Sequence, residues 1–438
     1  MELLIVFFLF LGCMAASLAL GVTMLLPLGL GFVFFSALAL RRGYSVRQIL
    51  KMAIATLPES LIVIRVMVLI GCLTGLWRSC GTVACFVVGG VRLMPPAMFL
   101  LAAFLLSMGM SYALGTSFGV TATCGVILMA IARAGGVDPI LAAGAIYSGV
   151  YVGDRGSPAA SSGNLVAALT ETDMRQNVRR MIPSSLVPIL LCCALYGLLS
   201  VFHPMGAADI SVLAELEGAF RLHWACFIPA ILMLALPFCG VPVKGSMGVS
   251  ILASLIVAVA VQGQSLWAAL WTMVAGYTPA DGALSELLSG GGIVSMLEVC
   301  GILAISGTYG GIFRETGLLT GVTEKLRALA GKIGRYPAAL LMSAVISAIF
   351  CNQTISAIMH NELASPLYAP GENTEKMLDM ENSVILTAGL VPWCIACSVP
   401  LGMLGVGPKA LLFSYYLFLL PLCFCVQRVR EDRKRKRA

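Results

Sequence analysis

Charged residues are scarce in this chain of 438 residues. Only 11% are Asp, Glu, Lys or Arg, whereas soluble domains have roughly 25%. Hydrophobic residues make up 59% of the chain, and its mean hydropathy is +0.96. A soluble protein of this composition could not cover its surface with polar groups, so lipid must be the solvent. The apolar stretches are continuous rather than alternating, which excludes a β-barrel and predicts an all-α polytopic membrane protein.

The chain also lacks the motifs of ATP-driven pumps and of enzymes. Neither a glycine-rich phosphate loop nor a nucleophile with its base and acid is found. The 15 cysteines are scattered, mostly inside apolar stretches, where cysteine acts as a small hydrophobic residue. Cys394-x-x-Cys397 has metal or redox spacing but no partner ligands nearby in the sequence. We therefore expect neither an enzyme nor a resident cofactor or metal.

Basic residues are concentrated in a few loops and at the C-terminus, a distribution that gives no nucleic-acid signal. About 11 membrane spans are expected, because each span needs about 20 apolar residues. The positive-inside rule assigns the basic groups between the spans to the cytoplasm. These groups are Arg41 to Lys51, Arg175 to Arg180, Lys325 to Arg335 and residues 428–437. Both termini are then cytoplasmic, and the membrane is expected to be the inner membrane of a bacterium.

One seven-residue segment occurs twice. Gly75-Leu76-Trp77-Arg78-Ser79-Cys80-Gly81 resembles Gly311-Ile312-Phe313-Arg314-Glu315-Thr316-Gly317. Only Arg92 follows the first copy before the next apolar stretch, whereas at least four basic residues follow the second. The copies are therefore expected on opposite sides of the membrane. This predicts two inverted-topology repeats with the substrate site between them; chance similarity of glycine-rich helices is the alternative.

Five parts are expected along the chain. Each repeat should contain a broken or hairpin helix, because polar residues and glycines interrupt the apolar stretches at 107–119 and at 351–354. The parts are an N-terminal helical hairpin with a cytoplasmic loop (1–56), the first repeat (57–202), connecting helices with an external loop (203–292), the second repeat (293–427) and a basic tail (428–438).

Four motifs, in the same order along the chain, resemble the NhaC-type Na⁺/H⁺ antiporter family. They are Arg41-Arg42-Gly43-Tyr44-Ser45, Leu-Gly-Thr-Ser-Phe-Gly at 114–119, Gly153-Asp154-Arg155-Gly156-Ser157-Pro158 and Leu390-Val391-Pro392-Trp393. The resemblance extends from about residue 22 to residue 407. It implies an inner-membrane exchanger with two inverted halves. Members of this family exchange sodium for protons, or carboxylates such as malate and lactate with coupled ions.

The chain departs from the family pattern at three positions where the family has Asp. These positions are Ser161, Asn352 and Asn382. Sodium prefers oxygen ligands, and a carboxylate can also accept a proton, whereas these three side chains offer oxygens without charge. The resemblance thus implies a cation/proton antiporter that works by alternating access. An ion-coupled carboxylate or amino-acid transporter on the same fold is the alternative.

Asp154 is the strongest functional candidate. An ionisable residue at membrane depth is costly and is usually functional. Burial disfavours a charged carboxylate, so a proton and a cation can compete for it. The alternative is an Asp154–Arg155 pair that holds a loop at the interface. The expected cation and proton site comprises Asp154, Ser157, Ser161, Asn352, Gln353, Glu381 and Asn382.

Two further groups of residues are candidates. Thr116, Ser117 and Thr354 are expected to bind substrate at the hairpins, or else to form ordinary interhelical hydrogen bonds. Arg65 lies inside an apolar span and needs a partner or water. It either pairs with Glu298 across the repeat interface or binds a substrate carboxylate. The expected partners are membrane lipids and a small ion or organic solute, and a homodimer is compatible with the chain.

Overall fold

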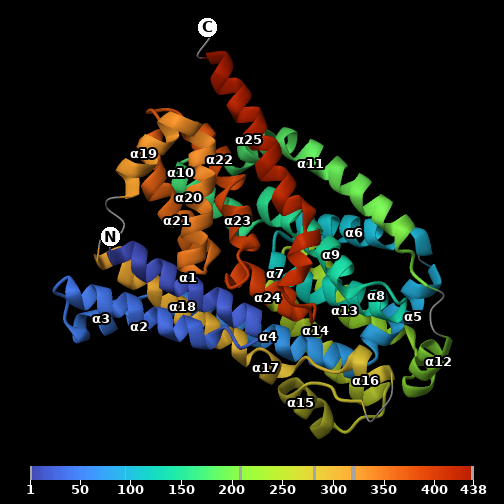
Figure 1. Cartoon of the computed structure of the whole chain (residues 1–438). Helices are drawn as coiled ribbons and strands as arrows, with labels where there is room; N and C mark the ends of the chain where they lie inside the picture. The colour runs from blue at the N-terminus through green and yellow to red at the C-terminus, as the bar shows by residue number, and fades with distance from the viewer. Residues whose placement is uncertain (1, 94, 207–209, 280–282, 317–321, 436–438) are drawn as a thin grey trace.

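The computed structural model describes residues 2–93, 95–206, 210–279, 283–316 and 322–435. Figure 1 shows a bundle of helices in which segments from both halves of the chain pack together. In the described residues the only β-structure is an isolated bridge between Tyr277 and Gly290. The expectation of an all-α protein is therefore confirmed.

The helices fall into four groups along the chain. The N-terminal group is α1 (Glu2–Leu20), α2 (Leu25–Arg41) and α3 (Val46–Ala55). The next is α4 (Leu57–Ser79), α5 (Thr82–Leu93), η1 (Pro96–Met98), α6 (Phe99–Leu114), α7 (Ser117–Val120), η2 (Thr121–Gly125), α8 (Val126–Ala134), α9 (Pro139–Gly156), α10 (Ser161–Thr170) and α11 (Met174–Phe202).

The connecting group is α12 (Ile210–Ala219), η3 (Trp224–Phe227), α13 (Ile228–Phe238), α14 (Val243–Ala260), α15 (Leu266–Ala275), α16 (Ala283–Leu288) and α17 (Gly292–Ser295). The last is α18 (Leu297–Thr316), α19 (Val322–Ile333), α20 (Arg335–Phe350), α21 (Gln353–Ala364), η4 (Ser365–Leu367), α22 (Asn373–Glu381), α23 (Val384–Leu390), α24 (Ile395–Met403), η5 (Pro408–Phe413) and α25 (Tyr415–Arg435).

Several of these helices are long and apolar enough to cross a membrane. Four qualify singly: Pro96–Leu114, Ser117–Ala134, Met174–Phe202 and Val243–Ala260. Two bent pairs raise the number to six within the described residues: Val63–Ser79 with Thr82–Gly90, bent by 65°, and Asn373–Leu390 with Ile395–Met403, bent by 55°. Six shorter apolar helices accompany them. The chain is thus an integral membrane protein, and some of its apolar helices are interrupted.

Long α11 shows how the bundle meets lipid. Asp173 caps its N-terminus by accepting a hydrogen bond from the Gln176 N–H at 3.0 Å. One face of the helix carries buried residues, among them Cys192 and Tyr196. The opposite face exposes large apolar side chains, as expected for a face that contacts lipid. These are Ile182, Leu186, Val187, Leu190, Leu191, Leu198, Val201 and Phe202.

Glycines allow α6 and α9 to pack in close contact. A side chain at Gly149 or Gly153 would overlap the backbone of α6 at Phe104 or Ser111. The two glycines are four positions apart and therefore lie on the same face of α9. Lipid tails are as apolar as the helix side chains, so the hydrophobic effect does not drive helices together in a membrane. Close van der Waals packing of this kind stabilises their contact instead. It fixes the end of α9, where the candidate site begins.

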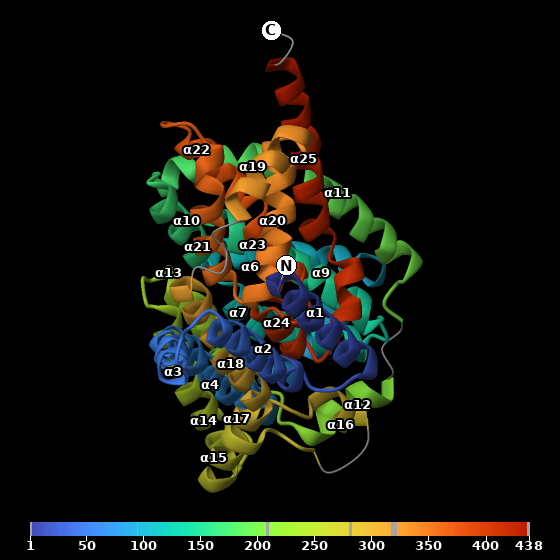
Figure 2. The ribbon, with the colours of Figure 1, turned by 60° about the vertical axis from the view of Figure 1, so that its left-hand side comes forward.

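The two ends of the bundle carry different elements. Figures 1 and 2 both show α10, α19, α22 and the C-terminal end of α25 at one end, and α12, α15 and α16 at the other. α25 continues as a helix through much of the expected basic tail. Its Arg428 contacts Glu375 and lies 2.9 Å from the fully buried Asp379 of α22. This ion pair fastens the last helix to the second half of the bundle.

Candidate functional site

Two helix breaks have nearly the same backbone conformation. α6 is followed by Gly115 (φ 64°, ψ 27°) and α20 by Cys351 (φ 54°, ψ 14°), both left-handed. The next residues are extended: Thr116 has φ −142° and ψ 119°, and Asn352 has φ −142° and ψ 124°. Each of these two side chains caps the helix that follows. The helix interruptions expected in these two stretches are therefore present.

Each of these breaks packs against another one. A side chain at Gly115 would overlap the backbone of Ala159, which lies between α9 and α10. The Ile395 N–H, at the start of α24, donates to the Cys351 carbonyl oxygen at 2.9 Å. The interrupted segments therefore meet in two pairs. The first N–H groups of α7 and α21 have no partners within their own helices, so these helix ends attract negative charge.

Asp154 lies in the last turn of α9, where the broken helices meet, and its side chain is buried. The side-chain amide of Gln353, the first residue of α21, donates to Asp154 Oδ2 at 3.1 Å. The hydroxyl and backbone N–H of Ser117, the first residue of α7, also interact with this carboxylate. Ser162 of α10 donates to the Asp154 carbonyl oxygen. Residues from both halves of the chain thus converge on one carboxylate.

The neighbouring Arg155 is fully buried. In the described part of the chain the two form no ion pair, so the alternative of an Asp154–Arg155 pair does not hold. Removing a guanidinium from water is costly, and here neutral oxygens accept hydrogen bonds from its two terminal nitrogens, whereas Nε has no partner among the described residues. The accepting oxygens are Met181 O (3.1 Å), Ser184 Oγ (2.8 Å), Ser185 Oγ and Asn382 Oδ1 (2.5 Å).

Glu381 is the second buried carboxyl group of this region. It ends α22 and is 1% exposed. Its Oε2 atom has no hydrogen-bond partner among the described residues. Glu381 interacts electrostatically with both Arg155 and Asp154. Two acids and one guanidinium therefore share one buried region, and their net charge is −1 when both acids are ionised.

The remaining residues of the expected cation site have other environments. Ser157 is buried, and its hydroxyl accepts a hydrogen bond from the Ala159 N–H at 3.1 Å, which shapes the turn after α9. Ser161 is exposed at the start of α10. Asn352 caps α21, where its Oδ1 accepts a hydrogen bond from the Thr354 N–H at 2.9 Å. The Thr354 side chain itself is exposed.

The structure brings together Ser117, Asp154, Gln353, Glu381 and Asn382 from the expected set. Sequence reasoning missed two tyrosines of α9. The hydroxyls of Tyr147 and Tyr151 both donate to the Ala396 carbonyl oxygen, at 2.9 and 3.0 Å. They hold α24 against α9. Their spacing of four residues puts them on one face of the helix, which is the signal that could have identified them.

Arg65 and Glu298 do not form the ion pair that was one alternative for them. Arg65 is exposed on α4. Glu298, in the first turn of α18, accepts a hydrogen bond from the Thr23 hydroxyl at 2.5 Å. Its carboxylate is engaged by the connection between α1 and α2 rather than by α4. Glu298 also lines a cavity that does not include Asp154.

Comparison with known proteins gives several relatives that are similar over most of the chain. A malate-2H⁺/Na⁺-lactate antiporter of Bacillus subtilis is 28% identical over 87% of this chain and 83% of its own. An arginine/ornithine antiporter of Halobacterium salinarum is 25% identical over 93% of this chain and 87% of its own. An Na⁺/H⁺ antiporter NhaC of Alkalihalophilus pseudofirmus is 25% identical over 81% and 79%.

A family model also matches the chain, over a shorter range than these relatives. The model of the Na⁺/H⁺ antiporter family matches residues 149–426. This range includes Asp154, Gln353 and Glu381, the groups that converge at the helix breaks. Because the match covers more than half of the chain, the protein belongs to the Na⁺/H⁺ antiporter family.

Proposed function

We propose that this protein is a secondary active transporter that exchanges Na⁺ or another monovalent cation for protons. The observation that carries the proposal is the buried carboxylate of Asp154, which accepts a hydrogen bond from Gln353, 199 positions away. A carboxylate held between two interrupted helices can bind either a cation or a proton. Antiport follows when each ion displaces the other from the same site.

The charges of the site support this exchange. Asp154 and Glu381 together with Arg155 carry a net charge of −1 when both acids are ionised. One monovalent cation, or one proton, neutralises the region. A buried region is most stable when its charges are balanced, because desolvation penalises an excess charge. The conformational change is therefore disfavoured when the site is empty and both acids are ionised. The protein then changes conformation with either a cation or a proton bound, which couples the transport of the two ions.

The helix breaks support two inverted repeats as the framework for alternating access. Cys351 lies 236 residues after Gly115, and Ile395 lies 236 residues after Ala159. The same offset relates Gln353 to Ser117, the two first residues of half-helices that contact Asp154. It also relates the two copies of the Gly-x-aromatic-Arg segment. One shared register over this length argues against chance similarity.

The proposed topology has about 11 spans, counted at about 20 residues per span, with both termini in the cytoplasm of a bacterial inner membrane. The starts of α11 and α19 and the end of α25 are basic and lie at one end of the bundle (Figures 1 and 2). The positive-inside rule makes that end cytoplasmic. Cysteine labelling at position 325 from inside, and at position 78 from outside, would test this orientation.

Exchange can be tested in proteoliposomes that contain a pH-sensitive dye. An imposed proton gradient should dissipate when Na⁺, Li⁺ or K⁺ is added to wild-type protein. Asp154→Asn keeps the size of the side chain but removes the exchangeable carboxylate, so cation-dependent dissipation should be lost. Asp138→Asn is the matched control, because Asp138 is an exposed N-cap at the other end of α9 and Asn is an equally good N-cap.

Two results would contradict this proposal. One is cation-dependent dissipation that persists in Asp154→Asn at the wild-type rate. The other is a wild-type protein that responds to none of the three cations. Vesicle incorporation of each variant should be measured in parallel, so that a missing protein is not mistaken for a missing activity.

Ion-coupled exchange of a carboxylate or amino acid is the second candidate function. Ser161, Asn352 and Asn382 are neutral, and in the structure Asn352 and Asn382 are used as a helix cap and as a partner of Arg155. Few carboxylates thus remain for a tightly bound cation. Uptake of a radiolabelled organic acid, driven by a proton or sodium gradient, would favour this candidate over simple cation/proton exchange.

A further inference from the structure

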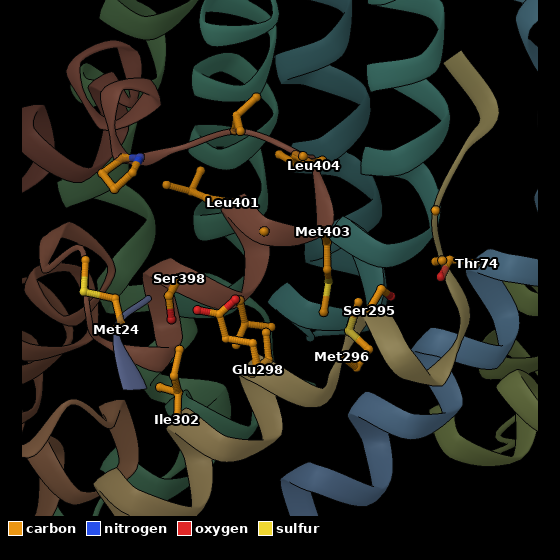
Figure 3. Close-up of a pocket in the computed structure, with 18 of the residues that line it drawn as sticks. Met24, Thr74, Ser295, Met296, Glu298, Ile302, Ser398, Leu401, Met403 and Leu404 are labelled. Carbon is orange, nitrogen blue, oxygen red and sulfur yellow. The ribbon is translucent and has the colours of Figure 1, made fainter. Parts of the chain in front are cut away.

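Two cavities of this protein differ in the charge of their walls. Figure 3 shows the cavity that Glu298 lines, which has a volume of about 580 Å³. Arg78 and Arg133 also line it, so its walls carry charges of both signs. A second cavity, of about 340 Å³, lies between α6, α9 and α11. Among the described residues that line it, Arg155 is the one charged group and most of the others are apolar. The second cavity therefore suits a largely apolar ligand.

This second cavity opens on the surface that faces lipid. α11 lies on the outside of the bundle in both views (Figures 1 and 2). Three of the large side chains that line the cavity are exposed there: Tyr112 of α6, and Ile182 and Leu186 of α11. In an integral membrane protein, exposed apolar side chains on an outer helix contact acyl chains. A ligand can therefore enter this cavity directly from the bilayer.

The cavity is about as deep as one leaflet of the bilayer. Its lining on α11 extends from Val178 to Ile189, which is about 16 Å at 1.5 Å per residue. The hydrocarbon core of a bilayer is roughly 30 Å thick. Gly109 of α6 and Gly156 of α9 also line the cavity, and an added Cβ atom at either would meet nothing within 4 Å. The missing side chains of these glycines thus leave room for one acyl chain.

Two arginines continue the cavity-lining face of α11 towards its N-terminus. Arg175 precedes Val178 by three positions and Ile182 by seven. Arg179 precedes Ile182 by three positions and Leu186 by seven. Residues at these spacings lie on the same side of a helix. Both arginines are exposed, and neither forms an ion pair within the described part of the chain. Their guanidinium groups are therefore available to an anion at the mouth of the cavity.

The start of α11 is also net positive. Residues 171–180 contain three arginines and two acids, a balance of +1 (3 − 2). One of the acids, Asp173, already caps the helix. The third arginine, Arg180, lies on the opposite face, because it precedes Val187 by seven positions and Val187 does not line the cavity. A basic helix end beside an apolar cavity is typical of a site for acidic lipids.

Arg155 supplies a free hydrogen-bond donor beside the same cavity. Its side chain is fully buried, and its Nε atom has no partner among the described residues. Its Nη1 atom donates to the carbonyl oxygen of Met181 at 3.1 Å. Met181 follows Arg179 by two residues, a rise of about 3 Å, so the guanidinium lies slightly deeper along α11 than Arg179. A buried donor without a partner favours a ligand that brings an acceptor oxygen to it.

We propose that the cavity between α6, α9 and α11 binds an acidic phospholipid such as phosphatidylglycerol. A phospholipid presents a phosphate, then ester carbonyl groups, then acyl chains. The protein presents matching groups in the same order: Arg175 and Arg179, then Arg155 Nε, then the apolar cavity. Guanidinium groups bind phosphate through charge-assisted hydrogen bonds. This site does not depend on the cation exchange proposed above.

Native mass spectrometry of the delipidated protein in detergent tests the proposal without any substitution. Phosphatidylglycerol and phosphatidylcholine with identical acyl chains are the probes, because both carry a phosphate but only the first has a net negative charge. Wild-type protein should retain one phosphatidylglycerol molecule with a preference of at least about tenfold. Glycerol 3-phosphate, which lacks acyl chains, should not displace it. Equal retention of the two lipids, or displacement by glycerol 3-phosphate as readily as by lipid, would overturn the proposal.

Substitutions then locate the site. The double variant Arg175→Gln/Arg179→Gln should lower the retention of phosphatidylglycerol by at least about tenfold, because it removes both charges at the mouth of the cavity. Arg180→Gln is the matched control, since Arg180 belongs to the same basic group but lies on the opposite face of α11. Unchanged retention in the double variant, or an equal loss in Arg180→Gln, would contradict a site on this face.

The acyl chain and the ester group can be tested separately. Gly109→Leu should fill the cavity and prevent retention, whereas Gly248→Leu in α14 is the control, because an added Cβ atom at Gly248 also meets nothing within 4 Å. Ether-linked phosphatidylglycerol, which lacks the ester carbonyl, should be retained several-fold less well than the ester-linked lipid. Full retention in Gly109→Leu would show that the lipid binds elsewhere, and equal retention of the two linkages would exclude Arg155 from the site.

Discussion

The two broken helices that meet at Asp154 have the same backbone conformation at the break but different side chains there. After α6, the left-handed position is Gly115 and the first helical residue is Ser117; after α20, they are Cys351 and Gln353. In the register of 236 residues, Asp154 corresponds to Leu390. The first half thus supplies the carboxylate, and the second half supplies a neutral amide that donates to it.

In the proposed framework of two inverted repeats, this difference leaves one asymmetric site between two similar breaks. Two carboxylates at corresponding positions would repel each other in a medium with little screening. With Leu390 in place of a second acid, both half-helix ends can stabilise a single charge. The second half contributes its acid, Glu381, from a different turn, where Arg155 lies nearby. The substitutions below test how far the two breaks are interchangeable, in order of decreasing effect.

The largest effect is expected at the first break. Gly115→Ala should lower stability by about 2–4 kcal/mol, because an L-residue is strained at positive φ and the new Cβ would overlap the Ala159 backbone. Neither backbone can shift without moving α10. The apparent melting temperature of the detergent-solubilised protein, followed by tryptophan fluorescence, should fall clearly. Transport should fall with it, since the break positions Ser117.

Gly109→Ala is the control for that substitution. Gly109 lies in the same helix, and an added Cβ atom there would meet nothing within 4 Å. Alanine is also the better helix former, so stability should stay the same or rise by up to about 1 kcal/mol. If Gly115→Ala were as harmless as this control, the tight contact between the two breaks would be wrong.

A smaller effect is expected when the two donors to Asp154 are compared. Gln353→Ala removes a side-chain donor to a charged group, and the apparent cation affinity should change by about tenfold to a hundredfold. Ser117→Ala should change it by less than about tenfold, because the Ser117 backbone N–H remains. Dose–response curves in proteoliposomes measure both.

Thr354→Ala serves as the matched control for Gln353→Ala. Thr354 is the next residue of α21, but its side chain is exposed. If Thr354→Ala changed the cation affinity as much as Gln353→Ala does, the Thr354 hydroxyl would belong to the site, as the sequence suggested. Equal effects of the Ser117 and Gln353 substitutions would instead indicate that the two half-helix ends act alike.

Local signals in the sequence predicted the two helix breaks, and the structure buries Asp154 beside them. Glycine and capping residues interrupt a helix through their own backbone preferences, so Gly115-Thr116 and the polar stretch from Asn352 could be read directly. An acid between glycines is equally visible. Nothing comparable marks which hydroxyl is buried after a turn: Ser162 contacts Asp154, whereas Ser161 is exposed. Which of the two serines is buried depends on how α10 is rotated about its own axis.

Contacts between distant segments were harder to predict. Arg155 of α9 contacts Ser184 of α11 and Asn382, and these contacts depend on how the helices pack rather than on any local signal. The Arg65–Glu298 pair failed for the same reason, since the rotation of each span was unknown.

The smallest effect is expected at the second break. Cys351→Gly relieves a left-handed conformation that costs a non-glycine residue about 1–2 kcal/mol. It also removes a buried thiol and makes the unfolded chain more flexible. Together these two unfavourable effects cost about as much stability as the relief of strain gains. Stability should therefore change by less than about 1 kcal/mol, a shift of a few degrees in melting temperature. A large loss would mean that the Cys351 side chain has a role beyond filling space, and that the two breaks differ in more than the charge they face.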